Sequence, residues 1–141
     1  MSVAHRPFSP EWATAFRDAV EADERYRATA AKWTWPVALV LDPAPELGYA
    51  EPVAVELALD GGRCHAAVIR HPDAVTAPFV LRAPYATWKQ VVKGELDPIA
   101  GVTRGRIGVK GSLATLMIHA RSASALCECA RAVPTHFPDE A

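Results

Sequence analysis

Two eight-residue runs on either side of Gly61-Gly62 constrain the fold of this chain more than any other feature. The runs, Val53–Asp60 and Arg63–Arg70, carry apolar residues at many alternating positions. Alternation with a period of two is typical of a half-buried β-strand. Because glycine adopts positive φ at little cost, a Gly-Gly pair can join two such strands in a tight turn. The sequence therefore predicts a β-hairpin, and with it a sheet that is at least partly antiparallel.

Three further segments are predicted to complete this sheet. The run VALVLD at residues 37–42 is rich in strand formers, PFVLRA at 78–83 contains another such run, and the short segment 106–110 lies between Gly105 and Gly111. Hairpin-linked strands followed by helices are typical of an α+β domain with a mostly antiparallel sheet. A doubly wound parallel sheet would need a regular alternation of strands and helices, which this sequence does not have.

Several helices have recognisable starts. Ser9-Pro10-Glu11 supplies a capping hydroxyl, a proline at the first helical position and an acid in the first turn. Asp23 can cap a second helical stretch, so we expect a break near residues 21–23; a single kinked helix is the alternative. Further short helices are predicted for residues 84–93 and after Asp97-Pro98.

A long C-terminal helix is predicted to begin at Ser112 and to run to about residue 132. Its apolar residues cover more than the usual face of an amphipathic helix. A stripe is formed by Leu113, Leu116, Met117, Ala120, Cys127 and Ala130, and it is widened by Ile118, Ala125 and Leu126. Such a face can be packed core, a lid over a ligand cavity or a surface for a partner. Periodicity alone favours core.

Composition and charge exclude several classes of protein. The chain has 141 residues, 50% of them hydrophobic, which favours one domain with its own core. Its 15 basic and 16 acidic residues give a net charge of −1, whereas broad nucleic-acid binding needs a basic surface. No apolar stretch approaches the ~20 residues that span a bilayer, and the N-terminus does not resemble a signal peptide. Neither nucleic acid nor stable membrane insertion is expected.

The residues that usually carry chemistry do not form a convincing site. Cys64 and His65 are neighbours on a predicted strand, so their side chains point to opposite faces and cannot act as a nucleophile–base pair. The five histidines lack the spacing of metal ligands, and the odd number of cysteines, three, favours reduced thiols in the cytosol. Lys110 and Ser112 could hold an anion at a helix start, but Ser112 as a plain helix cap is the better-supported interpretation. No cofactor, metal or catalytic residue is predicted.

Residues 79–117 contain the most distinctive run of motifs in the chain. The run FVLRAPYATWKQVVKGELDPIAGVTRGRIGVKGSLATLM has a strand, a short helix ending in Gly-x-Leu-x-Pro, a second short helix, and Gly-x-Ile-x-Val-x-Gly leading into a helix. The matching positions are Gly94, Leu96, Pro98, Gly105, Ile107, Val109 and Gly111. With the upstream VALVLD run and the Gly-Gly hairpin in the expected order, the chain resembles the sterol carrier protein type-two family from about residue 12 to residue 137.

This resemblance implies a five-stranded, mainly antiparallel sheet covered on one face by helices, with an apolar tunnel between sheet and helices. A cavity of several hundred cubic ångströms is the size expected for a small ligand. The resemblance implies non-catalytic binding and transfer of a sterol, fatty acid, fatty acyl thioester or phospholipid. The residues expected to line the cavity are Phe79, Leu81, Trp88, Val91, Val92, Leu96, Ile99, Val102, Ile107, Leu113, Leu116, Met117 and Ala120.

Basic residues are expected near the rim of this cavity. Arg104, Arg106 and Lys110 would attract an acidic head group or a phosphate there. The alternative is that they guard an exposed strand edge against pairing with another chain. Both interpretations fit the sequence equally well.

Two other functions are considered beside a lipid carrier. One is a protein-interaction or regulatory module, including a homodimer, that keeps the fold without taking up lipid. The other is an enzyme acting on a hydrophobic substrate with His119 or His65 as a base, for which the sequence gives little support.

The whole chain, residues 1–141, is predicted to form a single lipid-carrier-like domain, ordered from about residue 9 to residue 137. The last residues, Asp139-Glu140-Ala141, are not a peroxisomal targeting tripeptide, so a cytoplasmic location is expected. Phe137 would be exposed if the tail trailed into solvent, so the tail is expected to fold over the cavity mouth.

Overall fold

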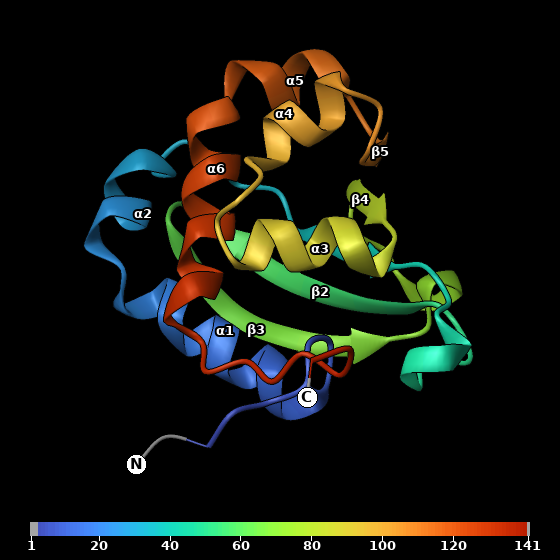
Figure 1. The fold of residues 1–141 in the computed structure, drawn as a ribbon. Helices are drawn as coiled ribbons and strands as arrows, with labels where there is room; N and C mark the ends of the chain where they lie inside the picture. The colour runs from blue at the N-terminus through green and yellow to red at the C-terminus, as the bar shows by residue number, and fades with distance from the viewer. Residues whose placement is uncertain (1–2, 141) are drawn as a thin grey trace.

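The computed structural model describes residues 3–140, which build one sheet and a layer of helices against one of its faces (Figure 1). The strands are β1 (Val37–Leu41), β2 (Val53–Asp60), β3 (Arg63–Arg70), β4 (Phe79–Ala83) and β5 (Gly108–Lys110). The helices are α1 (Pro10–Ala22), α2 (Glu24–Thr29), α3 (Tyr85–Val92), α4 (Pro98–Thr103), α5 (Leu113–Ile118) and α6 (Ala120–Glu128), with short 3-10 helices η1 (Pro45–Leu47), η2 (Pro72–Ala74) and η3 (Cys129–Ala132). The α+β class predicted from the sequence is confirmed.

The sheet has the strand order β3-β2-β1-β4-β5. β1 runs parallel to β4, and the other three pairs are antiparallel, so the prediction of a mainly antiparallel five-stranded sheet is confirmed. β1 lies at the centre, and all five of its residues are buried. Ala38 and Val40 are buried on the face away from the helical core as well. A strand buried on both faces needs a continuous apolar run, which explains VALVL.

The β2–β3 hairpin turns at Gly61-Gly62, as the sequence predicts. The two glycines have φ values of 59° and 89°, which are those of a type I′ turn. A Cβ at Gly62 would lie 2.5 Å from the carbonyl oxygen of Arg27, so the turn packs closely against α2. Further along, an extra residue in β3 bulges the strand and places both Cys64 and Ala67 against the core, although they are three residues apart.

The first helices begin at the caps that the sequence indicates. The Ser9 hydroxyl accepts a hydrogen bond from the Trp12 N–H at 3.2 Å, and the Asp23 carboxylate accepts one from the Tyr26 N–H at 2.7 Å. Asp23 itself has extended backbone angles, so α1 and α2 are two helices and not one kinked helix. Asp97 caps α4 in the same way.

The helix predicted from Ser112 to about residue 132 is wrong as a single element. Ser112 does cap α5, but His119 (φ −104°, ψ 30°) ends it after six residues, and α6 and η3 follow. The His119 ring packs edge-on against Trp33 and Trp35, with centroid distances of 5.4 and 5.8 Å. We attribute the break to this packing, because neither glycine nor proline stands at 119 to produce it.

The break changes which residues of the predicted apolar stripe face the core. Leu116, Leu126 and Cys127 are buried, whereas Leu113 is 51% and Ile118 is 80% exposed. A six-residue helix followed by a separate one does not continue a single apolar face, so Leu113 and Ile118 point outward while Leu116 stays inside.

β5 is shorter than the predicted strand at 106–110. The N–H groups of Arg106 and Ile107 donate to the Gly101 carbonyl oxygen at 2.8 and 3.1 Å. These bonds tie both residues to the end of α4, and strand pairing with β4 starts only at Gly108.

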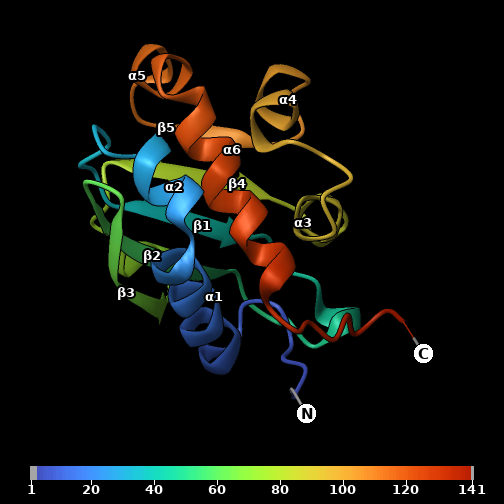
Figure 2. The same ribbon diagram turned by 90° about the vertical axis from the view of Figure 1, so that its left-hand side faces the viewer.

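α6 lies in the middle of the helical layer, where it packs against α2, α3 and α4 (Figure 2). The helices bury their apolar sides against the inward face of the sheet, on which Leu39, Leu57 and Leu81 lie. None of the helices within residues 3–140 is long and apolar enough to cross a bilayer.

The tail after η3 folds back, but against α3 and not over the pocket described below. Phe137 is buried, and the ammonium groups of Lys89 and Lys93 lie 5.5 and 5.1 Å from its ring centroid. Asp139 accepts hydrogen bonds from the Tyr85 hydroxyl at 2.6 Å and from Lys89 at 2.8 Å. The tail therefore belongs to the packed structure on the α3 side.

Candidate functional site

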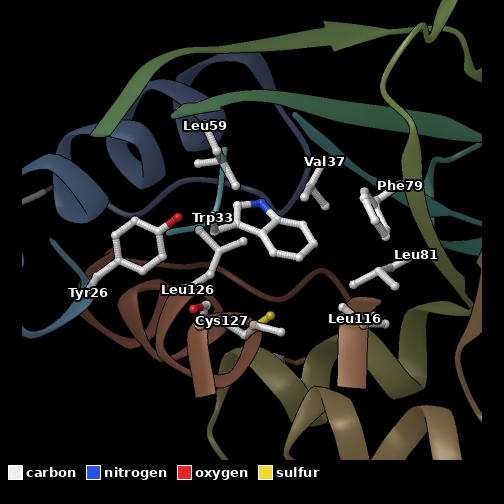
Figure 3. Close-up of a pocket in the computed structure, with 11 residues that line it drawn as sticks. Tyr26, Trp33, Val37, Leu59, Phe79, Leu81, Leu116, Leu126 and Cys127 are labelled. Carbon is white, nitrogen blue, oxygen red and sulfur yellow. The ribbon is translucent and has the colours of Figure 1, made fainter. Parts of the chain in front are cut away.

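An apolar pocket lies between the helix-covered face of the sheet and helices α5 and α6 (Figure 3). Its lining consists of Tyr26, Trp33, Val37, Leu59, Phe79, Leu81, Leu116, Ser122, Ala123, Leu126 and Cys127. The Ser122 hydroxyl donates to the carbonyl oxygen of Thr29 at 3.1 Å, so its polarity is satisfied within the protein. The lining offers a ligand almost entirely carbon surface.

The indole of Trp33 occupies the centre of this pocket (Figure 3). Its Nε1–H donates to the Trp35 carbonyl oxygen at 2.7 Å, and its ring lies 4.8 Å from the Phe79 ring and 5.4 Å from the His119 ring. The space left is about 20 Å³, little more than one water needs. This is far below the several hundred cubic ångströms that a preformed ligand cavity has. Room for a lipid therefore requires lining side chains, such as this indole, to move, and the tunnel that we expected stays a prediction.

A second small void lies on the other side of Cys127, toward α1. It measures about 10 Å³ and is lined by Phe8, Trp12, Phe16, Leu39, Trp88, Val91, Val92, Cys127 and Ala130. Phe8 and Trp12 stack there, with ring centroids 5.5 Å apart and planes 9° apart. Because Cys127 lines both spaces, apolar surface continues beneath α6 from one to the other.

The residues predicted to line the cavity are distributed over several places in the structure. The main pocket is lined by Phe79, Leu81 and Leu116, and the second void by Trp88, Val91 and Val92. Leu96 and Ile107 are buried outside both, and Ile99 and Val102 are half-buried. Leu113 is exposed, and Met117 and Ala120 line an open hollow on the outside of the molecule. Contact of any of these residues with a ligand stays a prediction.

The basic residues expected at the rim are all exposed. The guanidinium of Arg106 donates to the side-chain oxygen of Gln90 on α3. Lys110 is paired in register with Val80, so its side chain shares the face of the sheet that points away from the pocket. A head-group role for these cations at the pocket stays a prediction, and the direction of the Lys110 side chain does not favour it.

Burial makes the three thiols poor nucleophiles. It raises the pKa of Cys127 and Cys129 to about 12 and that of Cys64 to about 11. Thiols with such pKa values stay protonated at neutral pH, and the thiolate is the reactive form. Cys64 is buried while His65 is exposed, so the two point apart as the strand geometry predicts. Over residues 3–140, no cluster of histidine, cysteine and carboxylate side chains is suited to hold a metal ion.

Eight of the residues that line the pocket are not among those predicted from the sequence. The missed residues are Tyr26, Trp33, Val37, Leu59, Ser122, Ala123, Leu126 and Cys127. Strand alternation could have identified Val37 and Leu59, because each shares a face with other core residues of its strand. Trp33 lies in the irregular segment between α2 and β1, where no periodicity assigns a direction to a side chain.

Comparisons with known proteins agree with this architecture. Residues 16–121 match the sequence profile of the SCP-2 sterol transfer family. A crystal structure of sterol carrier protein 2 is 35% identical, with a TM-score of 0.86 over 91% of this chain and 99% of the other. A conserved hypothetical protein from Thermus thermophilus, described as possibly a sterol carrier protein, is 34% identical, with a TM-score of 0.86 over 96% and 94% of the two chains.

More distantly related proteins share the fold of this chain. Sterol carrier protein 2 from Yarrowia lipolytica is 14% identical, with a TM-score of 0.58 over 92% of this chain and 95% of the other, and it shares the fold. A search of curated proteins gave no match. The profile covers well over half of the chain, and two solved structures share at least a third of its sequence over nearly its full length. The chain belongs to the SCP-2 sterol transfer family.

Proposed function

We propose that this protein binds one hydrophobic ligand in the pocket around Trp33 and releases it chemically unchanged. Membership of the SCP-2 sterol transfer family supports lipid binding or transfer in general. For this chain we propose a sterol, fatty acid, fatty acyl thioester or phospholipid. The supporting observation is an almost wholly apolar pocket between sheet and helices whose centre is filled by one side chain, the indole of Trp33.

The energies involved allow an acyl chain to displace Trp33. Burying a sixteen-carbon chain gives on the order of 12 kcal/mol, at about 0.8 kcal/mol per methylene. Exposing an indole of roughly 200 Å² costs roughly 5 kcal/mol. A chain of about eight carbons gains only about 6 kcal/mol, which leaves almost nothing to offset the entropy of association. We therefore expect affinity to fall steeply below about eight carbons.

We propose that no reaction takes place on the ligand. The described lining of the pocket contains neither a carboxylate nor a histidine, and its one thiol, Cys127, is held protonated by burial, which raises its pKa to about 12. A single domain and a cytoplasmic location are part of the same proposal.

Native mass spectrometry of the purified protein, followed by extraction of whatever is bound, tests the proposal directly. We expect one lipid per chain, and its identity would give the ligand class. A protein that is empty and also fails to take up a fluorescent fatty acid would contradict the proposal. That result would favour an interaction module instead.

Substitution of Trp33 tests the location of the ligand. Trp33→Ala should lower the free energy of unfolding by about 3–5 kcal/mol and should tighten binding of fluorescent fatty acids, because the pocket no longer has to be emptied. Phe137→Ala is the matched control. It also removes a buried aromatic ring, but this ring lines neither the pocket around Trp33 nor the second void. Unchanged or weaker binding by Trp33→Ala would show that the ligand does not replace this side chain.

A further inference from the structure

The outward face of α5 is apolar, which is the reverse of an ordinary surface helix. Leu113 and Ile118 are two of the four exposed large hydrophobic residues among residues 3–140, at 51% and 80% exposure. Ala114 is exposed as well, and Met117 is half-buried. Leu113 lies four residues before Met117, and Ala114 four residues before Ile118, so these side chains form one continuous apolar side. Leu116 points the other way, into the pocket.

This helix stands in a part of the chain that carries only positive charge. Residues 98–127 contain Arg104, Arg106, Lys110 and Arg121 and no carboxylate. All four cations are exposed, and none forms an ion pair within the described part of the chain. The remainder of the chain has 11 basic and 16 acidic residues, a net charge of −5. The positive charge is therefore concentrated in the stretch of chain that contains α5, and Asp97, just before this stretch, lines a hollow together with Arg121.

The apolar face and the cations share one end of the molecule. α4, β5 and α5 lie together at the end opposite to both chain termini (Figures 1 and 2). Ile118 and Arg121 line the same open hollow, and Lys110 immediately precedes Gly111 and the Ser112 cap of α5. An apolar helix face with lysine and arginine beside it is suited to the boundary between head groups and acyl chains of a bilayer.

We propose that the outward face of α5, with Lys110 and Arg121 beside it, is a docking surface for a bilayer that contains anionic phospholipid. Two copies of this chain would not cover the same face well, because a twofold contact would place the cations of one copy against those of the other. An anionic bilayer offers both the apolar layer that Leu113 and Ile118 need and the charge that complements the cations. Docking would bring α5, whose inner side lines the pocket, against the membrane.

Cosedimentation of the full chain with vesicles tests this surface. We expect binding to vesicles of phosphatidylcholine mixed with phosphatidylglycerol, weaker binding to phosphatidylcholine alone, and weakening by salt. Leu113→Ser combined with Ile118→Ser should weaken binding by about tenfold or more. Val68→Ser is the matched control, because Val68 is also exposed but lies on β3 outside the cationic part.

The charges are tested separately. Lys110→Gln combined with Arg121→Gln should weaken binding to the anionic vesicles by about 25-fold, at about fivefold for each charge. Arg82→Gln on β4 is the control, since Arg82 is an exposed cation paired with Asp42 and should leave vesicle binding unchanged. All of these positions are exposed, so circular dichroism should show that each variant remains folded.

Several outcomes would overturn the docking surface. One is a wild-type protein that does not bind anionic vesicles. Another is a Leu113→Ser/Ile118→Ser variant that binds these vesicles as tightly as wild type does. A dimer in sedimentation velocity that this double variant abolishes would assign the face to a second copy instead. Vesicle binding and lipid uptake are measured in separate assays. A protein that binds vesicles but takes up no lipid would therefore contradict only the proposed function and not the docking surface.

Discussion

Glu21, at the end of α1, is the residue whose ionisation is most clearly coupled to folding. Its carboxylate accepts hydrogen bonds from the Arg63 guanidinium at 2.9 and 3.0 Å and from the Cys64 N–H at 3.1 Å. These hydrogen bonds lower the pKa of the carboxyl group from 4.5 to about 2, and those from Arg63 have the largest effect. One side chain thus joins the first helix to the β2–β3 hairpin.

The sign of this pKa shift gives a prediction. Because the folded state has the lower pKa, the contribution of Glu21 is present above pH 4.5 and is lost as the pH falls toward 2. Glu21→Gln should remove on the order of 1 kcal/mol at neutral pH and flatten the dependence of unfolding free energy on pH in that window. Urea unfolding at several pH values measures it, with Glu11→Gln in the exposed first turn of α1 as the control. Equal pH profiles for Glu21→Gln and wild type would refute the assignment.

At the scale of elements, the contact between the hairpin turn and α2 gives a second prediction. Gly62 and Gly105 both have positive φ, at 89° and 74°, but only at Gly62 would a Cβ meet backbone, that of Arg27. Gly105→Ala should therefore cost about 1–2 kcal/mol, and Gly62→Ala roughly 2–4 kcal/mol because steric overlap is added. Chemical denaturation of the two variants compares them, and equal losses would mean that the turn can move away from α2.

Elements that depend on neighbours in the chain could be predicted from the sequence, and elements that depend on distant contacts could not. The caps at Ser9 and Asp23 act on N–H groups three residues away, and the Gly-Gly turn joins adjacent strands. The break at His119 lies where its ring packs against Trp33 and Trp35, more than 80 residues earlier, and no local pattern marks it. The exposure of Leu113 and Ile118 on α5 is likewise not indicated by the apolar periodicity of this segment.

At the scale of the whole molecule, the docked tail combines two interactions of very different strength. Phe137→Ala should lower the unfolding free energy by about 3 kcal/mol, because a buried ring is lost. Asp139→Asn combined with Glu140→Gln should change it far less, since their ion pairs with Lys89 and Lys93 lie at the surface, where solvent screens the charges. Thermal unfolding measures both, and fatty acid uptake should be unaffected because the tail lines neither internal space. A large loss in the charge variant would contradict this ranking.

The number of strands could be predicted from the sequence, but their order in the sheet could not. Five strands and a mainly antiparallel sheet follow from local runs and one hairpin. The parallel pairing of β1 with β4 joins residues about 40 positions apart, and no local pattern specifies it. The volume of the pocket could not be predicted from the sequence either, because it depends on where the Trp33 indole packs among side chains from several distant elements.

The two ends of the chain are fastened to each other. The His5 N–H donates to the Pro134 carbonyl oxygen and the His136 N–H donates to the His5 carbonyl oxygen, each at 2.8 Å. Both ends leave the molecule on the side opposite to α4 and α5 (Figures 1 and 2). A linker or solid support attached at either end would therefore hold the protein by its far side and leave α5 free. The same closeness would allow the protein to be inserted whole into a surface loop of another chain.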